Sequence, residues 1–217
     1  MSNITGLNPQ KADIDFRVLS YNVWNAYTKI VKCFGWNIGT ELSQVWASPK
    51  AVEFGIKFSK QFSELINDCS SSFIAIINNS KRAIEIMANA NGVSVALDGE
   101  GEVEYMKEHQ GDSSFDFKEE KDGIVGMNMI QTRIIMGNLD ADYENLINDL
   151  DNLPLGSIAL YDPNNELIDA FTSMIKNVSE SITTLANSIK TDISSAMETE
   201  TNEIRIAKQV AVDTMTA

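Results

Sequence analysis

The stretch from Ala51 to Asn91 limits the fold more than any other part of the sequence. It contains no proline and a single glycine, Gly55. Its apolar residues recur at steps of three or four, with one step of seven, and this spacing follows one face of a helix and not a strand. Such a helix is roughly 60 Å long, and Asn91-Gly92 is a typical stop. The apolar positions are Phe54, Phe58, Phe62, Leu65, Cys69, Phe73, Ile76, Ala83, Met87 and Ala90.

A second helix is predicted upstream, over about Asp13–Val45, because its apolar residues also share one face. Gly35 and Gly39 weaken this helix locally or let another backbone approach it closely. The apolar positions are Val23, Ala26, Tyr27, Ile30, Cys33, Phe34, Ile38, Leu42 and Val45.

The two helices are separated by the short break Trp46–Pro49. Ser48 is a typical N-cap, and Pro49 suits the first position of a new helix, so we expect the long helix to begin there. A break this short between long amphipathic helices predicts an antiparallel hairpin.

The second half of the chain repeats this plan of helix, short break and long helix. A helix is predicted over Ile124–Leu153 and a connection over Pro154–Asn165, in which Asp162-Pro163 marks the restart. The long helix that follows contains neither proline nor glycine. The apolar positions of the two helices are Met127, Ile130, Ile134, Tyr143, Leu146, Ile147, Leu150 and Leu153, then Leu167, Phe171, Met174, Val178, Ile182, Leu185, Ile189, Ile193 and Met197.

The linker between the halves has a different pattern. Apolar residues alternate from Val93 to Tyr105 around the turn residues Asp98–Gly101, which is typical of a small β-hairpin. We therefore predict an all-α fold of two antiparallel helical hairpins that form an elongated four-helix bundle, with a small β-hairpin or irregular insertion between them. The expected division is a first hairpin over residues 1–92, a linker over 93–123 and a second hairpin over 124–217.

The composition argues against several classes of partner. The chain of 217 residues has a formal net charge of −14, which repels nucleic acids and anionic membranes. Its longest unbroken apolar run, Phe73–Ile77, is far shorter than the roughly 20 residues that span a bilayer. Residues Met1–Phe16 are polar and lack the apolar core of a Sec signal peptide. We expect no nucleic-acid partner and no stable insertion into a membrane.

The residues that usually carry catalysis are scarce. His109 is the single histidine and falls in the linker, and no nucleotide-binding motif or nucleophile elbow is present. Cys33 and Cys69 are expected to be core residues without a disulfide, because the hairpin alignment offsets them by about 9 Å along its axis. We therefore predict no enzyme, no cofactor and no metal centre.

Two groups of acidic residues are candidate divalent-ion sites. The group Asp140, Asp142 and Glu144 lacks the glycine that an EF-hand loop requires at its sixth position, and a continuous helix fits better. The group Asp98, Glu100, Glu102 and Glu104 lies in the predicted turn, where a solvated acidic turn is favoured over a weak divalent-ion site.

The first hairpin turn carries a motif formed by Leu42, Trp46, Ser48, Ala51 and Phe54. It resembles the WXG family, small helical hairpins exported by bacterial type VII secretion systems, in which a Trp-x-Gly turn joins two amphipathic helices. The resemblance covers about residues 13–91, and only the architecture recurs in the second half. Ser48 stands where the family has glycine. The family's export signal, tyrosine followed four residues later by an acid, is not found, since His109 follows Tyr105 and Ile147 follows Tyr143.

The resemblance implies a non-enzymatic accessory or substrate of type VII secretion, an adaptor that binds and escorts a helical partner such as the N-terminal domain of an exported toxin. The chain is then a monomer or homodimer, secreted without a Sec signal or cytoplasmic before export. The five motif residues are the expected turn and partner-binding element. An α-helical pore-forming toxin component and a phage or surface structural protein are the alternatives.

The large aromatic side chains bear on the same question. By periodicity we expect most of them in the core, and any left uncovered by a bundle of only four helices would mark an interaction surface. These residues are Trp24, Trp36, Phe54, Phe58, Phe62 and Phe73.

Overall fold

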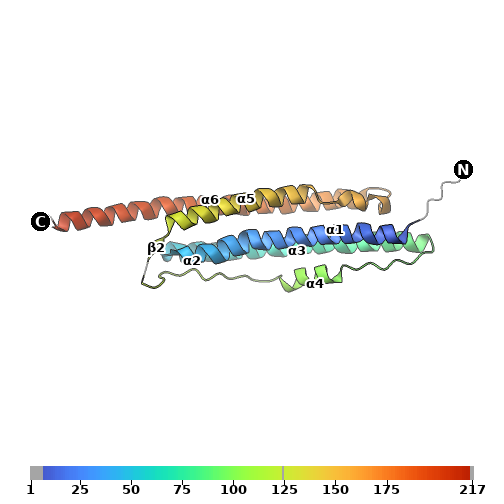
Figure 1. Ribbon diagram of the computed structural model, residues 1–217, viewed down its shortest axis with the longest axis horizontal. Coiled ribbons are helices and arrows are strands. Elements are labelled where there is room, and N and C mark those ends of the chain that lie inside the picture. Colours follow the sequence, from blue (N-terminus) through green and yellow to red (C-terminus); the bar gives the residue numbers. More distant parts are fainter. Residues whose placement is uncertain (1–6, 124, 216–217) are drawn as a thin grey trace. The chain divides into compact units, whose positions relative to one another are not determined.

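The computed structural model describes residues 7–123 and 125–215, with residues 201–215 as backbone only. The chain is all-α, with a single pair of very short strands in this described part (Figure 1). Its elements are α1 (Pro9–Ile30), η1 (Val31–Leu42), α2 (Ser43–Val45), β1 (Trp46–Ala47), α3 (Pro49–Ala90), α4 (Glu100–Glu108), β2 (Gly126–Met127), α5 (Met129–Asp151), η2 (Leu155–Ser157), η3 (Ala159–Tyr161) and α6 (Glu166–Met215).

The predicted first helix is present as the continuous run α1, η1 and α2. Asn8 caps its start by accepting hydrogen bonds from the backbone N–H groups of Gln10 and Lys11. The stretch η1 is a π-helix of 12 residues, an uncommon form whose wider turn uses bonds between residues five apart. Every predicted apolar position of this run is buried except Val45, which is half-buried.

The long helix α3 begins and ends where the sequence predicts. The Ser48 hydroxyl accepts a hydrogen bond from the backbone N–H of Ala51 at 3.1 Å, as an N-cap does. Gly92 has a φ of 66°, and the backbone N–H groups of Gly92 and Val93 donate to the carbonyl oxygens of Asn89 and Ala88. This is the Schellman arrangement, which requires a residue that tolerates positive φ.

The predicted β-hairpin in the linker is wrong. Glu100–Glu108 form the helix α4, which lies alongside α1 (Figure 1). Helical spacing places Val103 and Met106 on one face, and both are buried, whereas a strand would have separated them. The strand β2 follows the linker, where the sequence predicts the start of a helix, and it pairs antiparallel with β1, with Trp46 opposite Met127.

The second half contains α5, two short 3₁₀ turns and α6. The Asp162 carboxylate accepts hydrogen bonds from the backbone N–H groups of Leu167 and Ile168, so the predicted restart signal caps α6. The predicted buried face of α5 is wrong at its N-terminal end. Ile130 and Ile134 are exposed, and the buried positions there are instead Thr132, Ile135 and Leu139.

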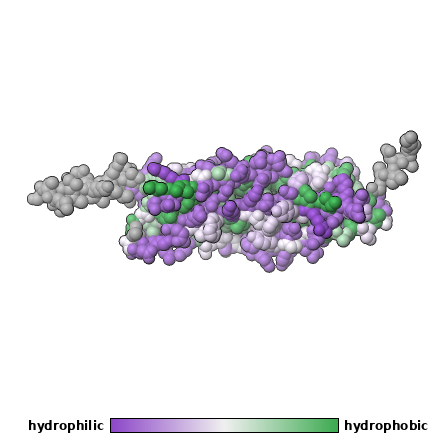
Figure 2. All heavy atoms as spheres, in the orientation of Figure 1, coloured by the Kyte–Doolittle hydropathy of each residue, from purple (hydrophilic) through white to green (hydrophobic). Residues whose placement is uncertain are grey.

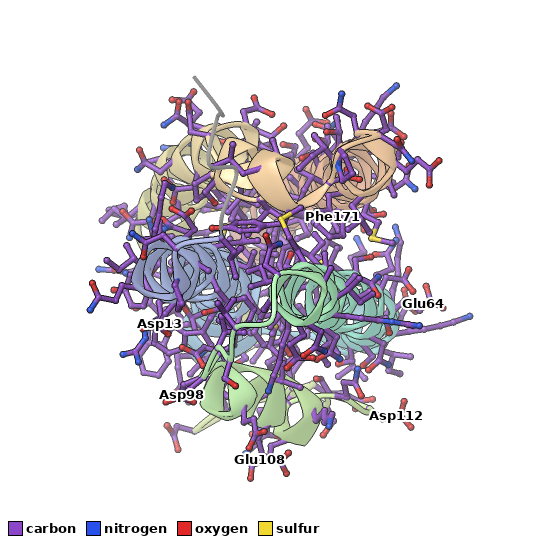
Figure 3. All side chains as sticks on the ribbon, turned by 90° about the vertical axis from the view of Figure 1, so that its right-hand side faces the viewer. Asp13, Glu64, Asp98, Glu108, Asp112 and Phe171 are labelled. Carbon is purple, nitrogen blue, oxygen red and sulfur yellow. The ribbon has the colours of Figure 1, made fainter. Side chains whose placement is uncertain are left out.

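The chain splits into two compact units that both draw on the long helices. Unit 1 comprises Met1–Val31, Ser63–Gly111 and Glu144–Ile182, and unit 2 comprises Lys32–Phe62, Asp112–Tyr143 and Thr183–Ala217. In unit 1, every α-helix contributes buried apolar residues, among them Phe16 of α1, Phe73 of α3 and Leu146 of α5. Figure 3 shows Phe171 of α6, which is fully buried, pointing inward among the helices, and Glu108 on the outer side of α4.

Within each unit the contacts between α1 or η1 and α3 are antiparallel, as a helical hairpin requires. In unit 1, Tyr27 packs edge-on against Phe73 with 6.4 Å between ring centroids. In unit 2, a β-carbon on Gly35 would lie 3.1 Å from the Phe62 ring, whereas Trp46, which follows Gly35, contacts Phe54, which precedes Phe62. The helical fold therefore fits the helical hairpin that the turn predicts.

Candidate functional site

The predicted turn motif is brought together in unit 2 but is not at the surface. Each of its five side chains has at most 6% of its area exposed. Trp46 packs against Phe54 of α3 and against Phe117 of the linker, so residues after the break and from a later segment cover the turn. The five motif residues are Leu42, Trp46, Ser48, Ala51 and Phe54.

The turn is closed by two later segments of the chain. The backbone N–H of Ser48 donates to the carbonyl oxygen of Lys118 at 2.9 Å, and that of Asn128 donates to the carbonyl oxygen of Val45 at 2.8 Å. The strand pair β1–β2 lies between these two bonds. The break between η1 and α3 is thus a small junction of three chain segments rather than a free hairpin loop.

A small hydrogen-bond network lies at the centre of this junction. The indole Nε1 of Trp46 donates both to the Ser48 hydroxyl, at 3.0 Å, and to the Glu200 carboxylate, at 2.8 Å. Glu200 lies on α6 and is itself buried. Because the Ser48 hydroxyl also caps α3, it performs two tasks that a glycine at this position cannot perform.

An aromatic row continues from the turn along α3. Ring centroids are 5.4 Å apart for Trp46 and Phe54, and 5.8 Å apart both for Phe54 and Phe58 and for Phe58 and Phe62. Two linker residues, Phe115 and Phe117, pack onto this row. Sequence analysis missed both, although a Phe-x-Phe pair within a polar stretch was a visible signal.

The burial of the turn motif has a direct consequence for recognition. A partner needs exposed area to contact, and the anchors of protein interfaces are residues that are accessible before binding. The buried motif therefore offers a partner little area to contact. Trp36 is the large aromatic residue of unit 2 that stands at the surface, with its indole N–H donating to Glu41 at 2.9 Å.

Three exposed apolar residues of unit 1 are aligned as a stripe on α1. Ile14, Val18 and Tyr21 follow each other at steps of four and three, and their exposed fractions are 59%, 43% and 56%. We call these three residues the α1 stripe. Figure 2 shows that hydrophilic residues cover most of the face drawn there and that apolar residues gather in separate patches.

Aromatic rings continue the α1 stripe toward α4. Tyr21 contacts Trp24 at 5.8 Å between centroids, and Trp24 contacts Tyr105 of α4 at 5.9 Å. His109 stacks on Tyr105 at 4.1 Å and is exposed. Sequence analysis did not single out the α1 stripe, because its spacing is indistinguishable from that of the buried face beside it.

Most of the acidic residues considered for ion binding lie on helices, but Asp98 lies in the loop before α4. Asp140 pairs with Lys190 at 2.5 Å, and Asp142 accepts a hydrogen bond from the side-chain amide of Asn37 at 2.9 Å. Glu100, Glu102 and Glu104 belong to α4. In the part of the chain that the structure describes, no three His, Cys, Asp or Glu side chains are grouped so that they could hold a metal ion.

Both cysteines are buried and free. Burial raises the pKa of the Cys33 thiol to about 12, with the nearby Asp142 carboxylate acting in the same direction. Burial also raises the pKa of Cys69. Both thiols are therefore neutral at physiological pH, and neither has the thiolate character that a nucleophile or a metal ligand requires.

A cavity of about 300 Å³ lies in unit 1 beneath α4. Phe16, Ile77 and Gly99 supply apolar walls, while Lys81 and Lys107 stand among its lining residues. Lys81 also pairs with Glu100 at 3.6 Å, so charges of both signs border the opening.

Two features thus stand out, a buried turn in unit 2 and an exposed apolar stripe in unit 1. Among the described residues, no helix is both long enough and apolar enough to cross a bilayer. No family model, no curated protein and no solved structure matches the chain.

Proposed function

We propose that the chain is a divergent, tandem WXG-like protein of a type VII secretion system, a non-enzymatic adaptor that binds and escorts a helical partner. The partner is a helical segment such as the N-terminal domain of an exported toxin. In this proposal the hairpin of α1 and α3 and the hairpin of α5 and α6 pair within the chain as a four-helix bundle.

The pairing of hairpins is supported by polar contacts inside each unit. In unit 1 the Lys29 ammonium of α1 pairs with the Asp149 carboxylate of α5. In unit 2 Lys57 of α3 pairs with Asp192 of α6 at 2.6 Å. A single WXG hairpin leaves an apolar face that needs a second hairpin, and two hairpins in one chain satisfy that need without a partner.

The relation to the WXG family is supported by the turn. Trp46 is buried between the two arms of an antiparallel hairpin, where a large residue closes the space that the turn leaves. Ser48, in place of the family's glycine, caps α3 and accepts from the Trp46 indole. Serine in place of the family's glycine therefore adds two hydrogen bonds to the turn.

The observation that carries the adaptor function is the α1 stripe. Its apolar residues occur at the spacing by which one helix packs against another. Ion pairs between Lys11 and Asp15, at 2.5 Å, and between Arg17 and Asp13, at 2.9 Å, flank it. An apolar centre with a charged rim is the usual composition of an interface between proteins.

The test is co-expression with the helical N-terminal domain of a toxin encoded beside this chain, followed by size-exclusion chromatography with light scattering. The wild-type chain is expected to elute with that domain in a defined stoichiometry. The variant I14S/V18S/Y21S should lose the complex and keep its helical circular dichroism, because its side chains are exposed.

The matched control is I130S/I134S, which removes exposed apolar area from α5 in unit 2. It is expected to retain the complex. Capture by the α1-stripe variant at the wild-type level would overturn the proposal. So would unchanged export of the chain from a host strain that lacks a functional type VII apparatus.

A further inference from the structure

The segment from Asp112 to Lys121, which we call the strap, is held to unit 2 by few backbone hydrogen bonds among the described residues. Its Phe115 N–H donates to the Ser59 hydroxyl at 3.3 Å, and its Lys118 carbonyl oxygen accepts from the Ser48 N–H. The Lys121 ammonium also donates to the Gln44 backbone carbonyl at 3.2 Å and to its side-chain oxygen at 2.5 Å. Opening of the strap breaks these bonds and unpacks its rings, but it breaks no hydrogen bond within a helix.

The main attachment of the strap is a pair of phenyl rings. Phe115 lies 5.1 Å from Phe58 and 5.5 Å from Phe62 between centroids. Phe117 lies 5.3 Å from Phe54 and also contacts Trp46. Both rings therefore reach the same aromatic row, while Asp116 between them is exposed.

Two glycines shape the surface that receives these rings. A β-carbon on Gly39 would lie 2.1 Å from the Phe115 ring, and one on Gly55 would lie 2.6 Å from the Phe117 ring. Real β-carbons essentially never approach other atoms within 3.0 Å, so each glycine provides the space for one ring. The aromatic groove is defined here by Gly39, Trp46, Phe54, Gly55, Phe58 and Phe62.

We propose that the aromatic groove is a docking site for a non-helical segment of a partner protein that presents two aromatic side chains separated by one residue, and that the strap occupies it as a built-in competitor. The strap shows the chemistry of the ligand, because its own Phe-Asp-Phe sequence fits the two glycine positions. Its tether gives it an effective concentration on the order of millimolar, so a partner must bind more tightly than the strap or wait until it opens.

This inference does not rest on the proposed function. A helical partner bound to the α1 stripe in unit 1 and a Phe-x-Phe segment bound in unit 2 involve different residues. A negative result in the toxin-domain experiment therefore does not contradict the proposal for the groove. A negative result in the peptide experiment below does not contradict the adaptor function.

The experiment uses a fluorescein-labelled peptide of residues 111–121 and the full-length chain, with binding followed by fluorescence anisotropy. The double variant F115A/F117A empties the groove and is expected to bind the peptide saturably. The wild-type chain should bind at least about tenfold more weakly, because its strap competes. A peptide in which both phenylalanines are alanine should not bind.

The control variant F115A/F117A/G39A fills one glycine position with a methyl group and is expected to lose the peptide. The proposal is overturned if the folded double variant shows no saturable binding, or if the triple variant binds as well as the double variant. Equal binding by the wild-type chain also overturns it, because the peptide would then bind elsewhere. Dimers of the wild-type chain that resist excess peptide would identify a second copy as the occupant and reject a separate partner.

A second measurement covers the case in which the double variant does not fold. Protease sites inserted after Gln110 and Asp122, both exposed, release the strap from the wild-type chain after folding. The excised segment should exchange with added labelled peptide, as followed by chromatography and mass spectrometry. Retention of the original segment against excess peptide, or loss of helical structure upon excision, would show that the strap is a fixed part of the fold.

Discussion

At the scale of single residues, Trp46 is the side chain that joins the most distant parts of unit 2. Its ring packs on Phe54 and Phe117, and its N–H reaches Ser48 and Glu200. A buried carboxylate depends on such donors, because an unsatisfied buried acceptor is costly. Both the shape and the polarity of the indole therefore contribute to the stability of unit 2.

We predict that Trp46→Phe lowers the free energy of unfolding by about 1 to 3 kcal/mol, because it removes the indole donor and leaves the Glu200 oxygen without it. Urea unfolding followed by circular dichroism at 222 nm measures this change. Trp36→Phe is the matched control, and it should stay within about 0.5 kcal/mol of wild type since Trp36 is largely exposed. Equal losses in the two variants would contradict the role assigned to the buried N–H.

Tyr27 is a second residue whose burial has a measurable effect. Its hydroxyl makes no hydrogen bond of ordinary geometry in the described part of the chain. Burial raises its pKa to about 12 from an ordinary value of 10.0, while neighbouring Ser70 acts in the opposite direction. The Ser70 hydroxyl itself donates to the carbonyl oxygen of Met106 at 3.0 Å.

The raised pKa of Tyr27 predicts a loss of stability in alkaline solution. Since the unfolded chain releases this proton above about pH 10 and the folded chain only near pH 12, the neutral phenol stabilises the fold fully below pH 10. This contribution disappears as the pH rises from 10 to 12, and at about 1.4 kcal/mol per pKa unit it amounts to about 2 to 3 kcal/mol.

Tyr27→Phe tests this, with unfolding measured in urea between pH 8 and 11.5. The variant should match or exceed wild-type stability at pH 8, because it removes a buried hydroxyl without a partner, and its alkaline decline should be shallower. Tyr21→Phe, on the same helix but exposed, keeps Tyr27 and should keep the wild-type decline. A Tyr27→Phe profile that runs parallel to wild type would refute the assignment.

At the scale of elements, a glycine inside a helix either makes room for a neighbouring side chain or faces open space. The sequence alone cannot distinguish these two roles. Gly55 lies within α3, and its missing side chain is replaced by the Phe117 ring of the strap. Gly137 lies within α5 and has no atom within 4 Å of the place where a β-carbon would stand. The first glycine is required by packing, and the second is a local weakness of its helix.

We therefore predict opposite effects for the same substitution at these two positions. Gly137→Ala should raise the free energy of unfolding by about 0.5 to 1 kcal/mol through helix propensity and the entropy of the unfolded chain. Gly55→Ala should lower it by about 1 to 3 kcal/mol, because Phe117 must move. The urea midpoints of both variants, compared at constant slope, measure these changes. A higher free energy of unfolding in both variants would mean that the Phe117 ring moves aside without cost.

At the scale of the whole molecule, charge imbalance opposes compaction. The 31 acidic residues outnumber the 17 lysines and arginines, so the compact state carries a net charge of −14. Ion pairs such as Lys57–Asp192 and Lys190–Asp140 act in the opposite direction, yet exposed pairs contribute little each. The net effect of the charges is self-repulsion.

Added salt is therefore expected to stabilise the protein. The Debye length falls from about 30 Å at 0.01 M to roughly 10 Å at 0.1 M ionic strength, which screens the repulsion between distant carboxylates. The melting temperature should rise between 10 and 300 mM sodium chloride, an increment of a few degrees that differential scanning calorimetry resolves. A melting temperature that falls over this range would show that the ion pairs outweigh the repulsion.

The sequence by itself determined the long helices and several of their ends, because these depend on neighbours in the chain. The steps of three and four that predict α3, the Ser48 cap and the Gly92 stop are local relations, and all appear in the structure. The Asp162 cap of α6 follows the same logic. The members of the predicted turn motif were also brought together, since they straddle a short break.

The tertiary structure decided which of several possible apolar faces are covered. The α1 stripe and the Ile130–Ile134 face have the same helical spacing as buried faces, and only the packing of other elements leaves them exposed. The helix α4 replaced the predicted hairpin because Val103 and Met106 gain burial together. Phe115, Phe117 and Glu200 reach the Trp46 turn from far along the chain. Such contacts depend on long-range packing, for which a local pattern carries no information.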